Sequence, residues 1–163
     1  SGFVLDGYMR IYSRWTDGMI FFAALTTLLP MLTGTSGNAG TQSVTLSIEA
    51  LSTGRRDWTI WKKVLSQEAR VGLIMGPCLA VIAFMRGILT STDKALFLSL
   101  SVACAIVVCV FTSTSLGALL PILCKRLKLD PAVISSPLIT SLMDILAVTI
   151  YFSMAILLMP LFL

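Results

Sequence analysis

Long apolar stretches recur along the whole chain, and short polar stretches separate them. Residues 71–85, 95–123 and 132–163 are almost free of charged side chains. Stretches of about 18 or more apolar residues are long enough to cross a bilayer as helices. The pattern therefore predicts an all-α fold, a polytopic bundle of transmembrane helices in a multi-pass protein of the cell membrane.

The polar stretches also set the expected order of elements in a single membrane domain. The expected segments are the end of a helix at 1–13, helices at 17–52, 71–90, 95–123 and 131–160, and a linker at 53–70. Residues 1–16 carry three charged side chains and cannot cross a membrane alone. The chain is therefore expected to begin inside its first helix, and a complete version would have five.

Composition supports this assignment and excludes several kinds of chemistry. Hydrophobic residues make up 56% of the chain and charged residues only 12%, whereas an average soluble domain carries about 25% charge. The chain has no histidine, and its four cysteines lie in apolar stretches at spacings that match no zinc site. Ser-His-Asp and Cys-His catalysis are excluded, and we expect no enzyme activity.

Basic residues concentrate in two polar stretches, 53–70 and 124–130. Two predicted spans lie between them, so both stretches fall on one side of the bilayer, and the positive-inside rule makes that side cytoplasmic. Because this topology explains most of the 12 basic residues, no nucleic-acid partner is expected. The first stretch also carries Trp58 and Trp61 at helical spacing, which suits an amphipathic interface helix or a connector packed on the bundle.

Ten residues inside the first long helix, GTSGNAGTQS at 34–43, contain no charge and no aliphatic side chain larger than alanine. The proline and glycines at 30, 34, 37 and 40 predict an unwound segment, which membranes tolerate where it lines a water-filled path. Nearby side chains are uncharged oxygen ligands or hydrogen-bond partners: Thr35, Ser36, Asn38, Thr41, Gln42, Ser43 and Thr45. The alternative is that the glycines allow close helix packing.

Asp144 lies well inside the last predicted helix. A charged aspartate at the centre of a membrane helix costs about 2.5–3.5 kcal/mol, and such residues usually face an aqueous cavity on an ion path. Ser136, Thr140 and Asp144 follow at four-residue spacing and predict one polar stripe. The alternatives are a protonated aspartate held by a neighbouring helix and an ion pair with Arg86.

All these candidate ligands are oxygen atoms, which select hard cations. One carboxylate per chain is too few for a calcium cage, whereas magnesium keeps several waters and commonly binds through one or two carboxylates. A twofold dimer would bring two aspartates to its axis. A proton-coupled carrier remains open on these grounds.

Two segments, PMLTGTSGNAGTQSVTLSIEAL at 30–51 and LDPAVISSPLITSLMDILAVTIYF at 129–152, closely resemble the membrane domain of MgtE-type magnesium channels. The similarity extends over essentially the whole chain, including GALLPILCKRLKLDPA at 117–132. The resemblance implies a homodimer in the lipid bilayer with five helices per subunit. It also implies an ion path between the subunits, lined by the second and fifth helices, for Mg²⁺ recognised largely through its water shell.

The resemblance further implies roles for individual residues. The ion-selecting aspartate falls on Asp144, and pore-facing positions fall on Gly34, Gly37, Asn38, Thr41, Thr45, Ser136 and Thr140. Asp130, at the cytoplasmic mouth, matches an acid linked to further cation binding, or it caps the helix that begins at Pro131. Glu49 stands where many members carry a basic residue and would attract cations there. Members usually carry a regulatory cytosolic magnesium-sensing region with CBS modules, and nothing in 1–163 resembles it.

The leading hypothesis is a passive magnesium-selective channel driven by the inside-negative membrane potential. A ring of Asp144 carboxylates, hydroxyls and backbone carbonyls would hold the hydrated ion at the dimer axis. The alternative is a secondary transporter of divalent cations, coupled to protons or sodium through Asp144. The two hypotheses differ in whether a proton gradient changes the flux.

Overall fold

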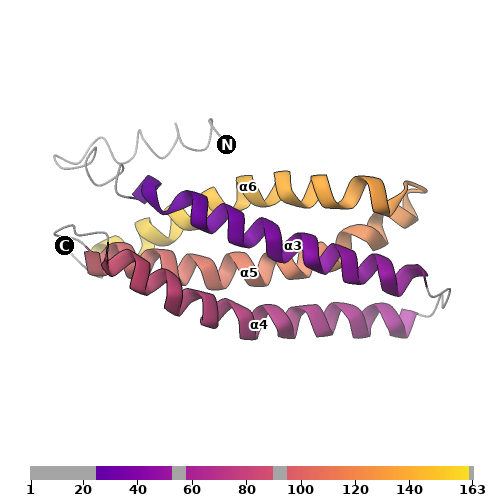
Figure 1. Ribbon diagram of the computed structural model, residues 1–163, viewed down its shortest axis with the longest axis horizontal. Coiled ribbons are helices and arrows are strands. Elements are labelled where there is room, and N and C mark those ends of the chain that lie inside the picture. Colours follow the sequence, from indigo (N-terminus) through magenta and orange to yellow (C-terminus); the bar gives the residue numbers. More distant parts are fainter. Residues whose placement is uncertain (1–24, 53–57, 90–94, 162–163) are drawn as a thin grey trace.

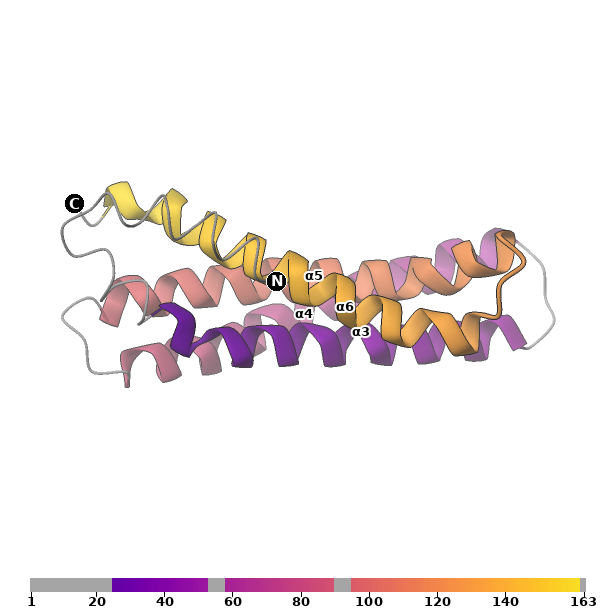
Figure 2. The same cartoon turned by 90° about the horizontal axis from the view of Figure 1, so that it is seen from above.

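The computed structural model describes residues 25–52, 58–89 and 95–161, and its elements are helical throughout (Figure 1). The elements are α3 (Leu29–Ser52), α4 (Trp58–Ile88), α5 (Ala95–Arg126), α6 (Pro131–Leu158) and the short 3₁₀ helix η1 (Met159–Leu161). Successive long helices run in opposite directions along the bundle (Figures 1 and 2). The predicted all-α bundle is confirmed, while the predicted helix end at 1–13 lies outside the described residues.

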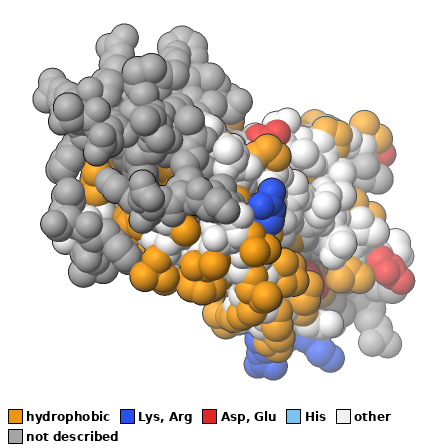
Figure 3. All heavy atoms as spheres, turned by 60° about the vertical axis from the view of Figure 1, so that its left-hand side comes forward, with side chains coloured by type: hydrophobic (Ala, Val, Ile, Leu, Met, Phe, Trp, Pro, Cys, Tyr) orange, Lys and Arg blue, Asp and Glu red, His pale blue; other side chains and the backbone are white. Residues whose placement is uncertain are grey.

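Three helices are long and apolar enough to cross a membrane: Trp61–Ile88, Ala95–Arg126 and Ser136–Leu158. The described part of α3 is not among them, because hydroxyls, amides and glycines lower its hydropathy. Large apolar side chains are exposed on the outer face of α4, including Leu73 and Ile74. Hydrophobic side chains also cover much of the described surface in Figure 3. These features are those of a multi-pass helical membrane domain.

The structure differs from the expected boundary between a linker at 53–70 and a helix at 71–90. A single helix, α4, runs from Trp58 to Ile88, and residues 53–57 lie outside the described part of the chain. The stretch 58–70 contains no glycine or proline and is rich in Lys, Leu, Gln, Glu and Arg, which favour helices. The amphipathic segment therefore continues the membrane helix directly.

The predicted unwound segment at 34–43 is wrong, because α3 is a continuous helix from Leu29 to Ser52. The carbonyls expected to serve as ion ligands there belong to a regular helix and accept its hydrogen bonds instead. The local irregularity lies earlier, at Leu28, which forms a turn and whose N–H donates to the Leu25 carbonyl at 3.3 Å. Pro30 explains this position, since it has no N–H to donate to the preceding turn.

The central helix is α5, which packs extensively on α3, α4 and α6. By contrast, α3 and α4 barely touch one another. The α4 helix approaches α5 through glycines: a Cβ atom added to Gly76 would lie 3.2 Å from Val107 Cα. Small residues at such contacts let membrane helices pack at short range. The arrangement leaves α3 and α6 together on one flank of α5.

Candidate functional site

The predicted site residues lie on α3 and α6, which pack side by side in opposite directions (Figures 1 and 2). A Cβ atom added to Gly37 would lie 3.8 Å from Thr140 Cγ2, and one added to Gly40 would lie 2.7 Å from Ile139 Cγ1. The two helices therefore meet at these glycines. Because the helices are antiparallel, Asp144, one turn beyond Thr140, lies level with the turn of α3 that precedes Gly37.

Most of the predicted residues form one face of this helix pair, which we call the polar face. It consists of Gly34, Gly37, Asn38, Thr41 and Thr45 on α3 and of Ser136, Thr140 and Asp144 on α6. Gly37 is buried, Thr41 and Ser136 are half-buried, and the others are exposed. Asp144 lies near the middle of α6, about 20 Å from either end at 1.5 Å per residue. An exposed carboxylate at this depth requires water, an ion or a protein partner.

The threonine hydroxyls of the polar face donate to the carbonyl one turn earlier in their own helices. Thr41 donates to Gly37 at 2.9 Å, Thr45 to Thr41 at 3.0 Å, and Thr140 to Ser136 at 3.1 Å. A hydroxyl has one proton to donate and two lone pairs that accept. Because the proton is used within the helix, each threonine oxygen presents only acceptor capacity to its surroundings. The three threonines therefore present hydrogen-bond acceptors beside the Asp144 carboxylate, while the Asn38 amide can both donate and accept.

The opposite face of α3 packs on α5. It carries four small buried residues, Ser36, Gly40, Ser43 and Ser47. The Ser113 hydroxyl donates to the Ser36 carbonyl, and the Ser43 hydroxyl donates to the Thr114 carbonyl at 2.7 Å. Ser36 and Ser43 are thus part of the helix contact and do not belong to the polar face.

The glycines of α3 divide between these two roles. A Cβ atom on Gly117 of α5 would meet the Gly40 carbonyl oxygen, and one on Gly34 would meet nothing within 4 Å. The packing interpretation is therefore correct for Gly40. The signal was present in the sequence: positions 36, 40, 43 and 47 repeat at helical spacing, as do 34, 38, 41 and 45. A shift of two residues is about 200° around a helix, so the two sets lie on opposite sides.

The two acidic residues expected at the mouth are exposed at the same end of the bundle. Glu49 lies in the last turn of α3, and Asp130 directly precedes α6, whose first residue is Pro131 (Figure 1). An aspartate followed by proline is also a common start for a helix, so the capping interpretation of Asp130 fits equally well. Cation binding by these two carboxylates stays a prediction.

No group of three or more His, Cys, Asp and Glu side chains gathers within residues 25–52, 58–89 and 95–161. Asp144 is accordingly the one acidic member of the polar face. The predicted alternative of an ion pair with Arg86 gains no support, because Arg86 lies on α4, which packs mainly on α5. The polar face can supply one carboxylate and several neutral oxygen acceptors, a set that suits a hard cation retaining its waters.

The fold and this face define a polytopic α-helical membrane protein with an acidic polar face on the α3–α6 pair. Comparison with known sequences takes the assignment further. A profile of the MgtE family, described as divalent cation transporters, matches residues 29–154, from the start of α3 to near the end of α6. The chain belongs to the MgtE family, which confirms the resemblance noted in the sequence.

Curated relatives support this assignment. A protein named magnesium transporter MgtE from Thermus thermophilus is 40% identical over 156 residues, which cover 96% of this chain and 32% of the relative. Proteins of the same name from Bacillus subtilis and Enterococcus faecalis are each 32% identical and cover 89% and 80% of this chain. The chain spans about a third of the length of these relatives.

Proposed function

We propose that this chain forms the membrane pore of a magnesium-selective channel, which carries Mg²⁺ into the cell down the membrane potential. One observation carries the proposal: α3 and α6 join a line of small and hydroxyl residues to an exposed carboxylate, Asp144, midway along a membrane helix. Relatives named as magnesium transporters support Mg²⁺ as the ion.

A second copy of the chain is the partner that the polar face requires in this proposal. A lone carboxylate at the bilayer centre is costly, and one carboxylate balances only half of a divalent charge. In a twofold homodimer the same face meets itself, so two Asp144 side chains approach the axis. Two carboxylates match the charge of one Mg²⁺, and the small residues of α3 leave room for an ion with its waters.

The direction of the threonine hydrogen bonds supports a hydrated ion in particular. Water bound to a cation points its hydrogens outward, so the wall of a pore must accept hydrogen bonds. Thr41, Thr45 and Thr140 have already donated their protons to backbone carbonyls and can only accept. Mg²⁺ gives up its waters reluctantly, so binding through the water shell suits it better than direct protein ligands.

The basic end of the bundle gives the proposed orientation. Lys62, Lys63, Lys125, Arg126 and Lys128 all lie at the end where α4 begins and α5 ends. The positive-inside rule makes this end cytoplasmic. An inside-negative potential then favours entry by roughly 4.6 kcal/mol per 100 mV for a divalent ion, twice the value for one charge. No second coupled ion is needed.

The test is Mg²⁺ uptake by the intact protein in proteoliposomes that carry an indicator dye. Uptake is measured under an inside-negative potential, with and without a proton gradient, for the parent and for Asp144→Asn. We expect the membrane potential to drive Mg²⁺ uptake at a rate that does not depend on the proton gradient. The rate should be at least tenfold lower in Asp144→Asn. Glu68→Gln is the matched control, because Glu68 is a carboxylate buried on α4, outside the polar face.

Two results would overturn the proposal in different ways. Uptake that follows the proton gradient would replace the channel with the coupled transporter, in which Asp144 carries the coupling ion. Equal uptake by Asp144→Asn and Glu68→Gln would place the ion path away from the polar face.

A further inference from the structure

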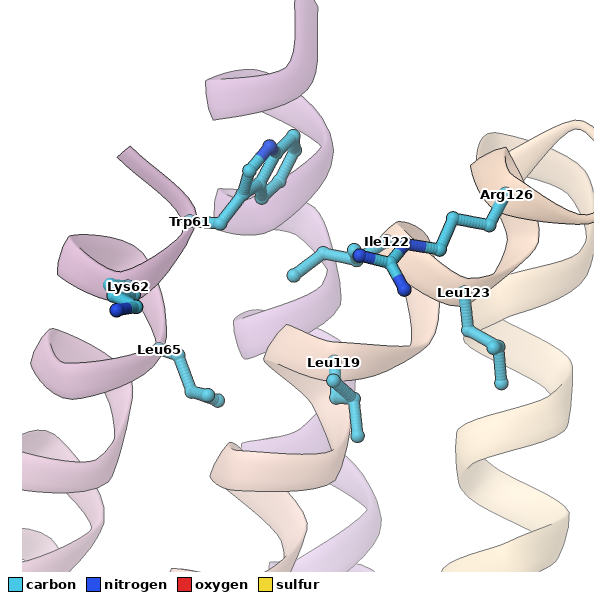
Figure 4. A pocket seen from close by; sticks show the side chains of 7 residues that line it. All are labelled: Trp61, Lys62, Leu65, Leu119, Ile122, Leu123 and Arg126. Carbon is cyan, nitrogen blue, oxygen red and sulfur yellow. The ribbon is translucent and has the colours of Figure 1, made fainter. Parts of the chain in front are cut away.

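A cavity of about 130 Å³ lies between α4 and α5 at the basic end of the bundle (Figure 4). Its lining includes Trp61, Lys62 and Leu65 from the first turns of α4 and Leu119, Leu123 and Arg126 from the last turns of α5. Apolar side chains line most of it, and the two cationic side chains come one from each helix (Figure 4). We call this cavity the lipid-side pocket. No residue of α3 or α6 lines it, so it is separate from the polar face.

The pocket spans the boundary between hydrocarbon and headgroups. Lys62 lies 24 residues before Arg86 on α4, or about 36 Å at 1.5 Å per residue, which exceeds a hydrocarbon core of about 30 Å. Leu119 lies two turns before Arg126 on α5, about 10 Å deeper along the helix. Trp61 suits the interface, where tryptophan is enriched in membrane proteins. The cations therefore lie at headgroup depth and the leucines at acyl-chain depth.

The pocket is walled almost entirely by apolar atoms, and Lys62 and Arg126 border it chiefly through their aliphatic stems, which favours an acyl chain inside the pocket and an anion at its rim. Its lining residues include two cations and no acidic side chain. An arginine guanidinium forms paired hydrogen bonds with phosphate, and a lysine adds a mobile positive charge. Leu119 and Leu123 are 46% and 49% exposed, an apolar surface open to an acyl chain. An apolar cavity of roughly 150 Å³ holds a benzene molecule, so this one accepts a short part of a single acyl chain.

We propose that the lipid-side pocket binds an anionic phospholipid of the leaflet at the basic end. The phosphate lies between Lys62 and Arg126, and one acyl chain follows Leu65 and Leu119 toward the bilayer centre. The lipid thereby joins the start of α4 to the end of α5. This inference uses none of the residues of the polar face and stands independently of the proposed channel.

The test measures thermal unfolding of the intact protein in detergent with added phosphatidylglycerol, phosphatidylcholine of the same acyl chains, or soluble glycerol phosphate. We expect phosphatidylglycerol to raise the Tm of the parent more than the other two additives do. The double variant Lys62→Ala/Arg126→Ala should lose this extra rise, with lipid binding weaker by roughly tenfold or more after loss of two charged hydrogen-bond donors.

The chain offers a close control. Lys63 and Lys125 are exposed neighbours of the two cations and do not line the pocket. The double variant Lys63→Ala/Lys125→Ala removes the same net charge and should keep the full response to phosphatidylglycerol. Leu119→Trp, which fills the pocket and changes no charge, should reduce it.

Three outcomes would overturn the proposal. An equal loss in both double variants would show general attraction of a basic surface to anionic lipid. An equal rise with glycerol phosphate would show a soluble-phosphate site, and an equal rise with phosphatidylcholine would show no preference for anionic lipid. Mg²⁺ uptake by Lys62→Ala/Arg126→Ala is measured alongside in liposomes of phosphatidylcholine, so that failure of this proposal and failure of the channel are read separately.

Discussion

Gly117→Ala tests the closest approach between α3 and α5. A Cβ atom at this position would meet the Gly40 carbonyl oxygen and lie 2.9 Å from Ser43 Cβ. A backbone oxygen cannot rotate away, so the two helices must separate. Overpacking of this kind costs about 1–3 kcal/mol. Separation also weakens the two hydrogen bonds between α3 and α5, at about 0.6 kcal/mol each in a membrane protein.

Alanine in place of glycine also favours the helix by about 1 kcal/mol, which offsets part of this cost. The net expectation is a loss of about 2 kcal/mol in the free energy of unfolding. Gly34→Ala is the matched control, because a Cβ there meets nothing within 4 Å and only the helix preference remains. The assay is titration with sodium dodecyl sulfate, followed by circular dichroism. Equal unfolding midpoints for the two variants would refute the described contact.

Further predictions concern hydroxyls and the polar face. Ser113→Ala should lower stability by about 0.6 kcal/mol in the same titration, because it removes a buried hydrogen bond to α3. Ser101→Ala should be neutral or stabilising, since its buried hydroxyl has no partner in the described part of the chain, and a comparable loss would contradict this account. Thr45→Cys, in a cysteine-free background, should be cross-linked between two copies of the chain by a bifunctional thiol reagent long enough to span a hydrated ion, while Leu73→Cys on the outer face of α4 should not; the reverse would remove the proposed dimer face. Thr140→Val keeps the shape of threonine and loses its acceptor oxygen, so it should lower Mg²⁺ uptake severalfold and leave the free energy of unfolding unchanged. Unchanged Mg²⁺ uptake would argue against a wall of acceptors.

The helices were largely predictable from the sequence because apolar length is a strong signal in membranes. The expected spans at 95–123 and 131–160 agree with α5 and α6 to within a few residues. The boundary at residue 70 was misplaced, because charged residues mark where a helix leaves the bilayer and not where it begins. Pro77, Pro121 and Pro137 lie inside their helices without ending them, as membrane helices commonly allow.

The candidate site was predicted less completely, and α3 shows why. Glycine and proline content suggested an unwound segment, yet Pro30 alone coincides with a local irregularity near Leu28. The glycines at 37 and 40 instead serve contacts with α6 and α5, which depend on neighbours that a local pattern does not reveal. The spacing of Ser136, Thr140 and Asp144 was a sounder guide, because it depends only on the helix that carries them.

The central place of α5 has a consequence for how the helices of this chain move relative to one another. Directional hydrogen bonds and a close backbone contact fasten α3 to α5, whereas α6 meets α3 at Gly37 and Gly40 through van der Waals contact. Packed helices slide past one another in small shear movements more readily than they break such bonds. A shear of α6 along α3 would shift Asp144 relative to the threonines of α3 and would also slide α6 along α5, on which it packs extensively. Hydrogen bonds therefore hold α3 to α5, whereas a movement of α6 has to slide its own buried side chains, Tyr151 and Phe152 among them, against the rest of the core.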